Sequence, residues 1–247
     1  MVQLKAEGIK KSFDGRTVLE GVSLNLREGE LVSLLGASGG GKTTLFQILA
    51  GLSLPDEGHV YINEEEVTGK PGKISYMLQK DLLLPYRTVE DNVALPLLLS
   101  GMKKAEARKK ASGYFEMFGL EGTEKKYPSQ LSGGMRQRAA LLRTYLFSRP
   151  IALLDEPFSA IDMLTRHTMH EWYLKVMEEI RLSTLFITHD IDEAVLLSDR
   201  ICILTGTPGN ITKEIIIKEA KPRNKDFHVS EEFLEYKREI IRHMEQS

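Results

Sequence analysis

Cysteine is almost absent from this sequence, and its scarcity excludes two kinds of structure. The 247 residues include a single cysteine, Cys202, so the chain has no internal disulfide and no cysteine-rich metal site. Cys202 lies in the apolar run 201–204, where a buried thiol is expected rather than a reactive one. Internal repeats and low-complexity segments are also missing.

Long hydrophobic runs and an excess of charge of one sign are absent as well. No stretch approaches the roughly 18 apolar residues that indicate a membrane-spanning helix, and the first residues lack the apolar core of a secretory signal. Lys and Arg total 33 against 35 Asp and Glu, a formal net charge of −2. This balance gives no electrostatic reason to expect nucleic acid binding. We therefore expect a cytoplasmic protein that binds no nucleic acid.

A glycine-rich loop at Gly36–Thr44, with the sequence GASGGGKTT, organises the rest of the chain. The apolar run 31–35 before it predicts a buried strand, and residues 45–50 after it predict a helix. In this context the pattern G-x-x-x-x-G-K-[ST] predicts phosphate binding by inward-pointing backbone N–H groups and a helix start. Lys42 can then reach the β- and γ-phosphates, and Thr43 can offer its hydroxyl to Mg²⁺. The alternative is a glycine-rich turn before an ordinary helix, which the later motifs disfavour.

A pair of acids follows a second apolar run. Residues 151–154 predict a buried parallel strand that delivers Asp155 and Glu156 at its C-terminal end, where ligands bind in open α/β sheets. Asp155 can hold Mg²⁺ through water, and Glu156 is a candidate general base for an attacking water. The alternative is a strand-end acid that only caps a nearby helix.

Three further sites are weaker evidence of function when each is taken alone. Gln79 and His189 each follow a predicted strand, at 73–78 and 183–188, and each could act at the same sheet edge or be an ordinary surface residue. The stretch Leu131–Arg138, LSGGMRQR, predicts a helix capped by Ser132 whose glycines allow close approach of an anion. Most Ser-Gly-Gly helix starts bind nothing.

The order of predicted elements indicates an α/β chain with a helical insert. Strands at Leu4–Ile9 and Val22–Leu26 flank a polar loop at Ser12–Arg16, which contains Phe13. Between about residues 82 and 149, helices are predicted at 88–99 and 103–118. The apolar segment Leu82–Tyr86 suits either an exposed docking patch or a loop folded onto its own domain. A last helix is predicted from residue 230, with Phe233, Tyr236, Ile240 and Met244 along one side.

With these pieces in place, residues 3–222 resemble the ATP-binding subunit of an ABC transporter. The family's motifs match in order: the adenine-stacking aromatic, Walker A, the Q-loop glutamine, the signature sequence, Walker B with its catalytic glutamate, the D-loop and the switch histidine. They are Phe13, Gly36–Thr44, Gln79, Leu131–Gln137, Ile151–Glu156, Ser159–Asp162 and His189. A single one of these motifs is weak evidence, but the ordered set is highly specific.

The resemblance implies a fold and a site. The fold would be the α/β fold of a P-loop NTPase, a RecA-like core with an N-terminal antiparallel β-layer and a helical signature subdomain at about 82–149. The cassette would span 1–222, with a C-terminal helical extension at 223–247. Thr43, Gln79 and Asp155 would hold Mg²⁺, and Glu156, His189 and Gln79 would serve ATP hydrolysis. The residues expected to bind ATP are Phe13, Gly36, Ala37, Ser38, Gly39, Gly40, Gly41, Lys42, Thr43, Thr44, Ser132, Gly133 and Gly134.

The resemblance also implies partners. Two subunits would meet head to tail and sandwich two ATP molecules, with Ser132, Gly133 and Gly134 acting on the ATP of the opposite copy. An integral membrane permease would dock near Leu82–Tyr86 and hold the chain at the cytoplasmic face of the membrane. An extracytoplasmic solute-binding protein would complete an importer.

The branch of the family is indicated by shorter stretches. LPYRTVEDNV, TGTPGNI and the KPRN at 221–224 resemble subunits that serve nitrate, sulfonate, taurine, bicarbonate or thiamine-precursor importers. Tyr86, Gly40 and Thr144-Tyr145 depart from that branch's usual residues, and Tyr86 weakens the permease match. Two other functions stay open: a soluble ABC ATPase in DNA repair or translation, and a P-loop kinase or GTPase. The last is disfavoured because the sequence has no N-K-x-D motif.

Overall fold

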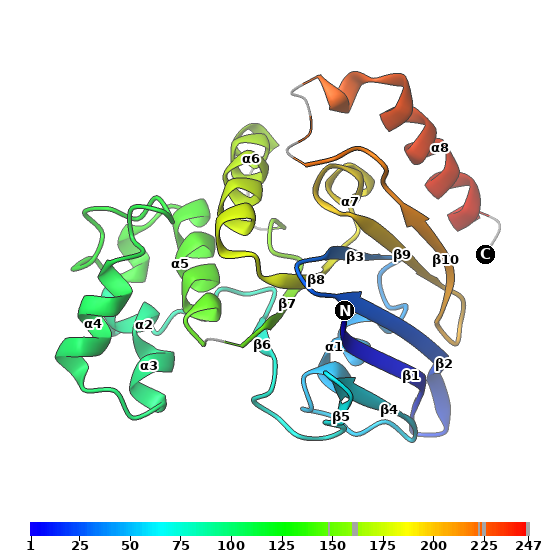
Figure 1. Ribbon diagram of the computed structural model, residues 1–247, viewed down its shortest axis with the longest axis horizontal. Helices are drawn as coiled ribbons and strands as arrows, with labels where there is room; N and C mark the ends of the chain where they lie inside the picture. The colour runs from blue at the N-terminus through cyan, green and yellow to red at the C-terminus, as the bar shows by residue number, and fades with distance from the viewer. Residues whose placement is uncertain (148, 160–162, 222, 224–225, 246–247) are drawn as a thin grey trace.

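The computed structural model describes residues 1–147, 149–159, 163–221, 223 and 226–245, with the backbone alone for 163–167. Two β-sheets form its framework (Figure 1). The smaller sheet has the order β2-β1-β4-β5, with β1 (Val2–Phe13), β2 (Arg16–Arg27), β4 (Glu57–Ile62) and β5 (Glu65–Glu66). The larger has the order β10-β9-β3-β8-β7-β6, with β3 (Leu31–Leu35), β6 (Ser75–Met77), β7 (Ile151–Asp155), β8 (Ser183–Thr188), β9 (Arg200–Thr205) and β10 (Asn210–Ile216).

The larger sheet is parallel apart from its edge strand β10. Its central strands β3, β7 and β8 are buried along their whole length, as their apolar sequences predict. Leu35 pairs with Thr188, and Asp155 pairs with Ile187, so these three strands end side by side. The segments that follow them therefore leave the sheet at one edge.

The N-terminal layer is more regular than the sequence predicts. β1 and β2 pair as one long antiparallel hairpin, with Ser12 opposite Thr17 and Phe13 opposite Arg16. The polar loop expected at Ser12–Arg16 is reduced to the turn Asp14-Gly15, where φ is 49° and 77°. Asp-Gly is a strong signal for a tight hairpin turn, and the prediction gave it too little weight.

Helix α1 (Lys42–Leu49) packs between the two sheets. Its apolar residues Leu45, Phe46, Ile48 and Leu49 are buried against strands of both sheets. This core includes Val32 and Leu34 of β3, directly before the glycine loop. The loop is thus anchored on both sides by buried elements.

The helical insert is present, with shorter helices than expected. The described helices are α2 (Val89–Val93), α3 (Leu95–Leu99), α4 (Lys104–Ser112) and α5 (Gly133–Tyr145), and they stand to one side of the sheets (Figure 1). The helix predicted at 88–99 breaks at Ala94, because Pro96 lacks the N–H that a continuous helix needs. The helix predicted at 103–118 ends at Ser112, and the following turns bury Phe115 and Phe118.

The last three helices complete the framework. They are α6 (Met163–Ile180), α7 (Ile191–Leu197) and α8 (Glu231–Glu245). α8 follows the outer side of β9 and β10 (Figure 1) and buries Phe233 and Ile240 in a core shared with α7. Tyr236 and Met244 pack against the same core, so the predicted contact face is confirmed. Among the described residues, no helix has the length and apolar character needed to cross a bilayer.

Candidate functional site

The glycine loop closes around its own lysine. Lys42 Nζ donates hydrogen bonds to the carbonyl oxygens of Gly36 (2.8 Å) and Ala37 (2.7 Å), which hold the side chain back across the loop. Gly39 and Gly41 have φ angles of 82° and 91°, a region that favours glycine. A Cβ at Gly36 would collide with the carbonyl oxygen of Leu204. The glycines are therefore required by this backbone shape.

The helix that follows the loop begins with unsatisfied backbone donors. Its N-cap, Gly41, has no side chain to accept a hydrogen bond, and its first turn contains no acidic residue. The N–H groups and positive dipole end of α1 therefore face the loop without an internal anion. Thr43 is exposed in this first turn, with Thr44 half-buried beside it.

An open cavity of about 470 Å³ lies at this helix start, where the central strands end. The loop, the two strand ends and the segment after β6 all contribute to its wall. Predicted site residues that line it are Ser38, Gly39, Gly41, Lys42, Thr43, Thr44, Gln79, Asp155, Glu156 and His189. These residues come from four separate stretches of sequence, which thus meet in one cavity.

Two polar side chains that line the cavity contact the carboxylate of Glu156. Gln79 Nε2 donates to its Oε2 at 2.8 Å, and His189 Nδ1 lies 3.2 Å from its Oε1. The Glu156 backbone has φ of 45°, uncommon for a residue with a side chain, and such strain collects at functional sites. The Ser159 hydroxyl donates to the Glu156 carbonyl at 3.0 Å. The Glu156 carboxylate is therefore contacted by side chains from two other segments, while Ser159 holds its backbone.

Burial shifts the pKa values of the other two charged groups. The pKa of Asp155 is raised, chiefly by burial and then by the neighbouring Glu156 charge. Hydrogen bonds from Tyr76, whose hydroxyl lies 3.4 Å from the Asp155 carboxylate, and from Thr43 partly oppose this. Burial lowers the pKa of Lys42. Both side chains are harder to charge than in water, so an anion at Lys42 and a cation at Asp155 would both be favoured.

Seven predicted residues do not line this cavity: Gly36, Ala37 and Gly40, which belong to the glycine loop itself, and four that lie elsewhere. Phe13 ends β1, is 47% exposed, and has Lys11 Nζ 5.3 Å from its ring centroid. Ser132, Gly133 and Gly134 lie at the start of α5, where the Ser132 hydroxyl accepts a hydrogen bond from Met135 N at 3.3 Å. Ser132 is exposed. Within a single chain, the signature sequence does not meet the glycine loop.

Sequence reasoning missed several residues of the site. Val18 of β2 and Ile187 of β8 line the cavity, and Tyr76 of β6 contacts Asp155. Ile187 could have been found, because it pairs with Asp155 two residues before His189. Val18 could not, because no local pattern brings β2 to the loop. Of the motif expected at Ser159–Asp162, residues 160–162 lie outside the described residues, as do Pro222 and Asn224 of KPRN.

The chain matches known proteins along most of its length. The family model described as ABC transporter matches residues 19–159. The chain is 48% identical over 191 residues to the formylaminopyrimidine import ATP-binding protein ThiZ of Halalkalibacterium halodurans, covering 77% of this chain and 74% of that one. It is 39% identical to the aliphatic sulfonates import ATP-binding protein SsuB of Bacillus cereus, covering 97% and 94%.

A solved structure agrees with the fold. The dimeric structure of a post-hydrolysis state of the ATP-binding cassette MJ0796 bound to ADP and Pi superposes with a TM-score of 0.76 and 32% identity, covering 88% of this chain and 100% of that one. The expected α/β P-loop NTPase fold is confirmed by this likeness. A glycine loop around Lys42, strand-end acids and matches of this extent lead to one conclusion: the chain belongs to the ABC transporter family of ATP-binding proteins.

Proposed function

We propose that this chain is the ATP-hydrolysing subunit of an importer, in which two copies bind ATP and power a separate membrane permease. The cavity in which Lys42 of the glycine loop meets Asp155 and Glu156 carries the proposal. The names of the relatives, which serve import of a formylaminopyrimidine and of aliphatic sulfonates, support import over the alternative roles in DNA repair or translation.

The residues in the cavity suit ATP together with Mg²⁺. Among the described residues, no three His, Cys, Asp or Glu side chains are grouped to hold a metal ion by themselves. Thr43, Gln79 and Asp155 instead offer hydroxyl, amide and carboxylate oxygens, the hard ligands that Mg²⁺ takes together with substrate phosphates. When bound, Mg²⁺ would neutralise charge on the β- and γ-phosphates. These three residues would hold it, while Lys42 and the loop N–H groups would bind the phosphates.

Glu156 would activate the attacking water. Its carboxylate accepts from Gln79 and lies beside His189, so both partners can orient it. As general base it would polarise a water in line with the γ-phosphate. Gln79 would help to place that water, and His189 would contact the γ-phosphate. Hydrolysis would then release the γ-phosphate, the group that these residues contact together.

A second copy would supply the rest of the site. Ser132, Gly133 and Gly134 start α5 with exposed or half-buried backbone and no acid in the first turn, which leaves this helix start free for an anion. They would bind the ATP held by the loop of the opposite copy. The dimeric form in which MJ0796 was solved with ADP and Pi supports a pair of copies, which we propose to be head to tail. Phe13 would stack on the adenine.

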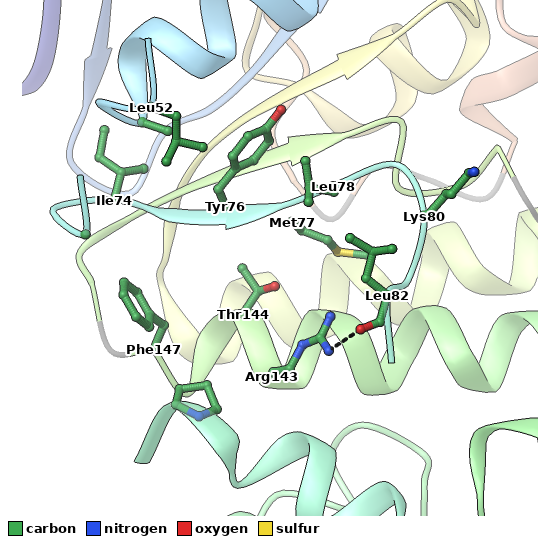
Figure 2. Close-up of a pocket in the computed structure, with 13 residues that line it drawn as sticks. Leu52, Ile74, Tyr76, Met77, Leu78, Lys80, Leu82, Arg143, Thr144 and Phe147 are labelled. Carbon is green, nitrogen blue, oxygen red and sulfur yellow. Dashed lines mark hydrogen bonds between the residues drawn. The ribbon is translucent and has the colours of Figure 1, made fainter. Parts of the chain in front are cut away.

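A hollow beside the segment Leu82–Tyr86 is our candidate permease site (Figure 2). It has a volume of about 280 Å³, and the exposed apolar residues Leu52, Leu78 and Leu82 are on its wall. Arg143 Nη1 donates to the Leu82 carbonyl at 2.9 Å and so fixes this segment to α5 (Figure 2). Tyr86 nearby is 93% exposed. An apolar patch of this kind suits a helix of another protein.

The position of the hollow would couple the permease to ATP. Gln79, which bonds to Glu156, lies three residues before Leu82 in the same loop. A movement of the docked permease would therefore reach the site through a short stretch of backbone. In this arrangement residues 1–222 form the cassette, 82–149 the helical subdomain and 223–247 a C-terminal extension. The chain would lie at the cytoplasmic face of the membrane, and a solute-binding protein would deliver the solute outside.

Hydrolysis of ATP by the purified chain tests the activity, and Lys42→Ala tests the site. A charged hydrogen bond contributes about 1.5–3 kcal/mol, so the ATP Kd should rise about 10- to 100-fold. Lys125→Ala changes an exposed lysine in the helical insert and should bind ATP as the wild type does. Unchanged ATP binding by Lys42→Ala would contradict the phosphate site. Co-purification with an integral membrane protein separates the importer from a soluble ATPase, and competition by GTP tests the base preference.

A further inference from the structure

A cluster of polar side chains is buried directly behind the catalytic edge, and none of the motifs accounts for it. Its members are His170 of α6, Glu193 of α7 and Thr188 at the end of β8, which are 7%, 4% and 2% exposed. A carboxylate this deeply buried is unfavourable unless other groups hydrogen-bond to it or neutralise it. The cluster therefore has a defined geometry, set by its own contacts.

These contacts fix the backbone on both sides of His189. The Thr188 hydroxyl donates to Glu193 Oε2 at 2.7 Å and accepts from the Asp190 N–H at 3.0 Å. His170 Nε2 lies 3.4 Å from the other carboxylate oxygen, Oε1 of Glu193, which is an electrostatic contact without hydrogen-bond geometry. His189 is the residue between Thr188 and Asp190. Its side chain reaches Glu156 from the backbone position that these hydrogen bonds hold.

His170 also contacts the segment that carries Glu156. The ring of Phe158 meets the ring of His170 edge to face, with centroids 4.8 Å apart and planes at 77°. Phe158 is buried and lies two residues after Glu156, in the turn where Ser159 N donates to the Glu156 carbonyl. One side chain on α6 thus packs against both segments whose polar groups meet in the cavity.

We propose that His170 is a positioning residue for hydrolysis, which sets the Glu156 and His189 side chains relative to each other through its contacts with Phe158 and Glu193. This inference rests on the proposed ATPase function and adds a residue to it. The position needs an N–H that can face a carboxylate and a flat ring that can pack on Phe158. Imidazole meets both needs, whereas an aliphatic side chain of similar size meets neither.

The test compares His170→Gln with His170→Leu in the full chain. Because misplacement of reacting groups by about 1 Å costs up to about 100-fold in rate, His170→Leu should lower kcat for ATP about 10- to 100-fold. Its ATP Kd and KM should stay within about twofold of the wild type, because the phosphate cradle is untouched. His170→Gln keeps an N–H donor at similar reach but loses the ring, so its kcat should lie between those of His170→Leu and the wild type.

Two further variants separate positioning from folding. Tyr173→Phe keeps a ring on the same helix packed against Phe158, at 5.3 Å between centroids, and should leave kcat and thermal stability unchanged. His170→Leu with Glu193→Gln removes the buried charge left without the imidazole. Its midpoint of thermal unfolding should recover relative to His170→Leu alone, while kcat stays low. A kcat that recovers with stability would overturn the inference.

Other results would also overturn it. A kcat within about twofold of the wild type in His170→Leu would mean that the ring does not position the catalytic groups. An equal loss of kcat in His170→Gln would mean that the N–H donor has no role. If the wild-type chain itself hydrolyses no ATP while binding it, the proposed function fails instead, so the two failures are distinguishable.

Discussion

The starts of α1 and α5 are two versions of one arrangement in a single chain. Both helices begin after glycine-containing loops, and neither has an acidic residue in its first turn. Gly41 leaves the first N–H groups of α1 without a side-chain cap, while Ser132 caps one N–H group of α5 at 3.3 Å. The first faces a cavity in its own chain, and the second lies outside that cavity.

Other helices of the chain show what these two starts lack. α2 has Glu90 and Asp91 in its first turn, and α7 has Asp192 and Glu193 there behind an Asp190 cap. Those carboxylates interact with the positive helix end from within the chain. A helix start without such an acid can instead accept an anion from outside. α3 also begins without an acid, so this feature leaves a helix start open to an anion but does not by itself identify a ligand site.

The two open starts also differ in their electrostatic surroundings. α1 faces Asp155 and Glu156 across the cavity, so an anion bound there needs Lys42 and a cation to balance these acids. The start of α5 supplies N–H groups and a hydroxyl without a catalytic group beside it. In the proposed site, the start of α1 would carry the chemistry and the start of α5 would complete it from the opposite copy, which is the asymmetry expected of a site shared by two copies.

The largest effect should come from a change on the α1 side of the proposed site, at Glu156. Glu156→Gln removes the proposed base and keeps the side-chain shape, so kcat should fall about 10²- to 10⁴-fold. ATP should still bind, and it should stabilise a dimer that gel filtration or light scattering can detect. Glu28→Gln, an exposed glutamate elsewhere, is the control and should hydrolyse ATP normally. Normal steady-state turnover by Glu156→Gln would refute the base assignment.

A smaller effect is expected from a change at the start of α5, which would complete the site of the opposite copy. Ser132→Arg puts a long charged side chain at the start of α5, and a misplaced charge buried in an interface costs about 2 kcal/mol or more. Hydrolysis should fall about 30-fold or more, while one chain should still bind ATP with unchanged affinity. Ser129→Arg, three residues earlier and also exposed, is the matched control. If Ser132→Arg also lost ATP binding, the role of Ser132 in the opposite copy would be wrong.

The sequence predicted the parts of the site that depend on contiguous patterns. We expected one sheet edge to hold the glycine loop, the two acids at the end of β7 and the residues after β6 and β8, because parallel strands end together. The contact of Gln79 with Glu156, 77 residues apart, follows from that rule. The roles of these residues stay predictions, as do the domain limits.

Part of what the sequence did not predict depends on packing between distant elements, and part has a local cause. Tyr76 reaches Asp155 only because β6 pairs with β7, and Val18 reaches the loop only because the long hairpin folds over it. The break at Ala94 and the short α4 are local in origin, from Pro96 and from turns that bury aromatic residues. Apolar periodicity continued across both and overstated the helices.

The smallest effect is expected at the start of α2, where an acid of the chain itself occupies the first turn. Asp91 in the first turn of α2 accepts from Arg108 Nε and Nη2 at 2.8 and 2.7 Å, and this pairing lowers the pKa of Asp91. Because the pair is partly exposed, Asp91→Asn should lower the free energy of unfolding by only about 0.5–1 kcal/mol. Kinetics of ATP hydrolysis should not change.

The pH dependence of that difference has a defined sign. A carboxylate whose pKa is lowered by folding stabilises the native state fully above its unfolded pKa of about 4, and this contribution disappears as the pH falls through the lower folded value. Urea unfolding should therefore separate Asp91→Asn from the wild type at pH 7 and bring the two together in acid. A double-mutant cycle with Arg108→Gln assigns the difference to the pair. A gap that persisted in acid would mean that shape, and not charge, stabilises this helix start.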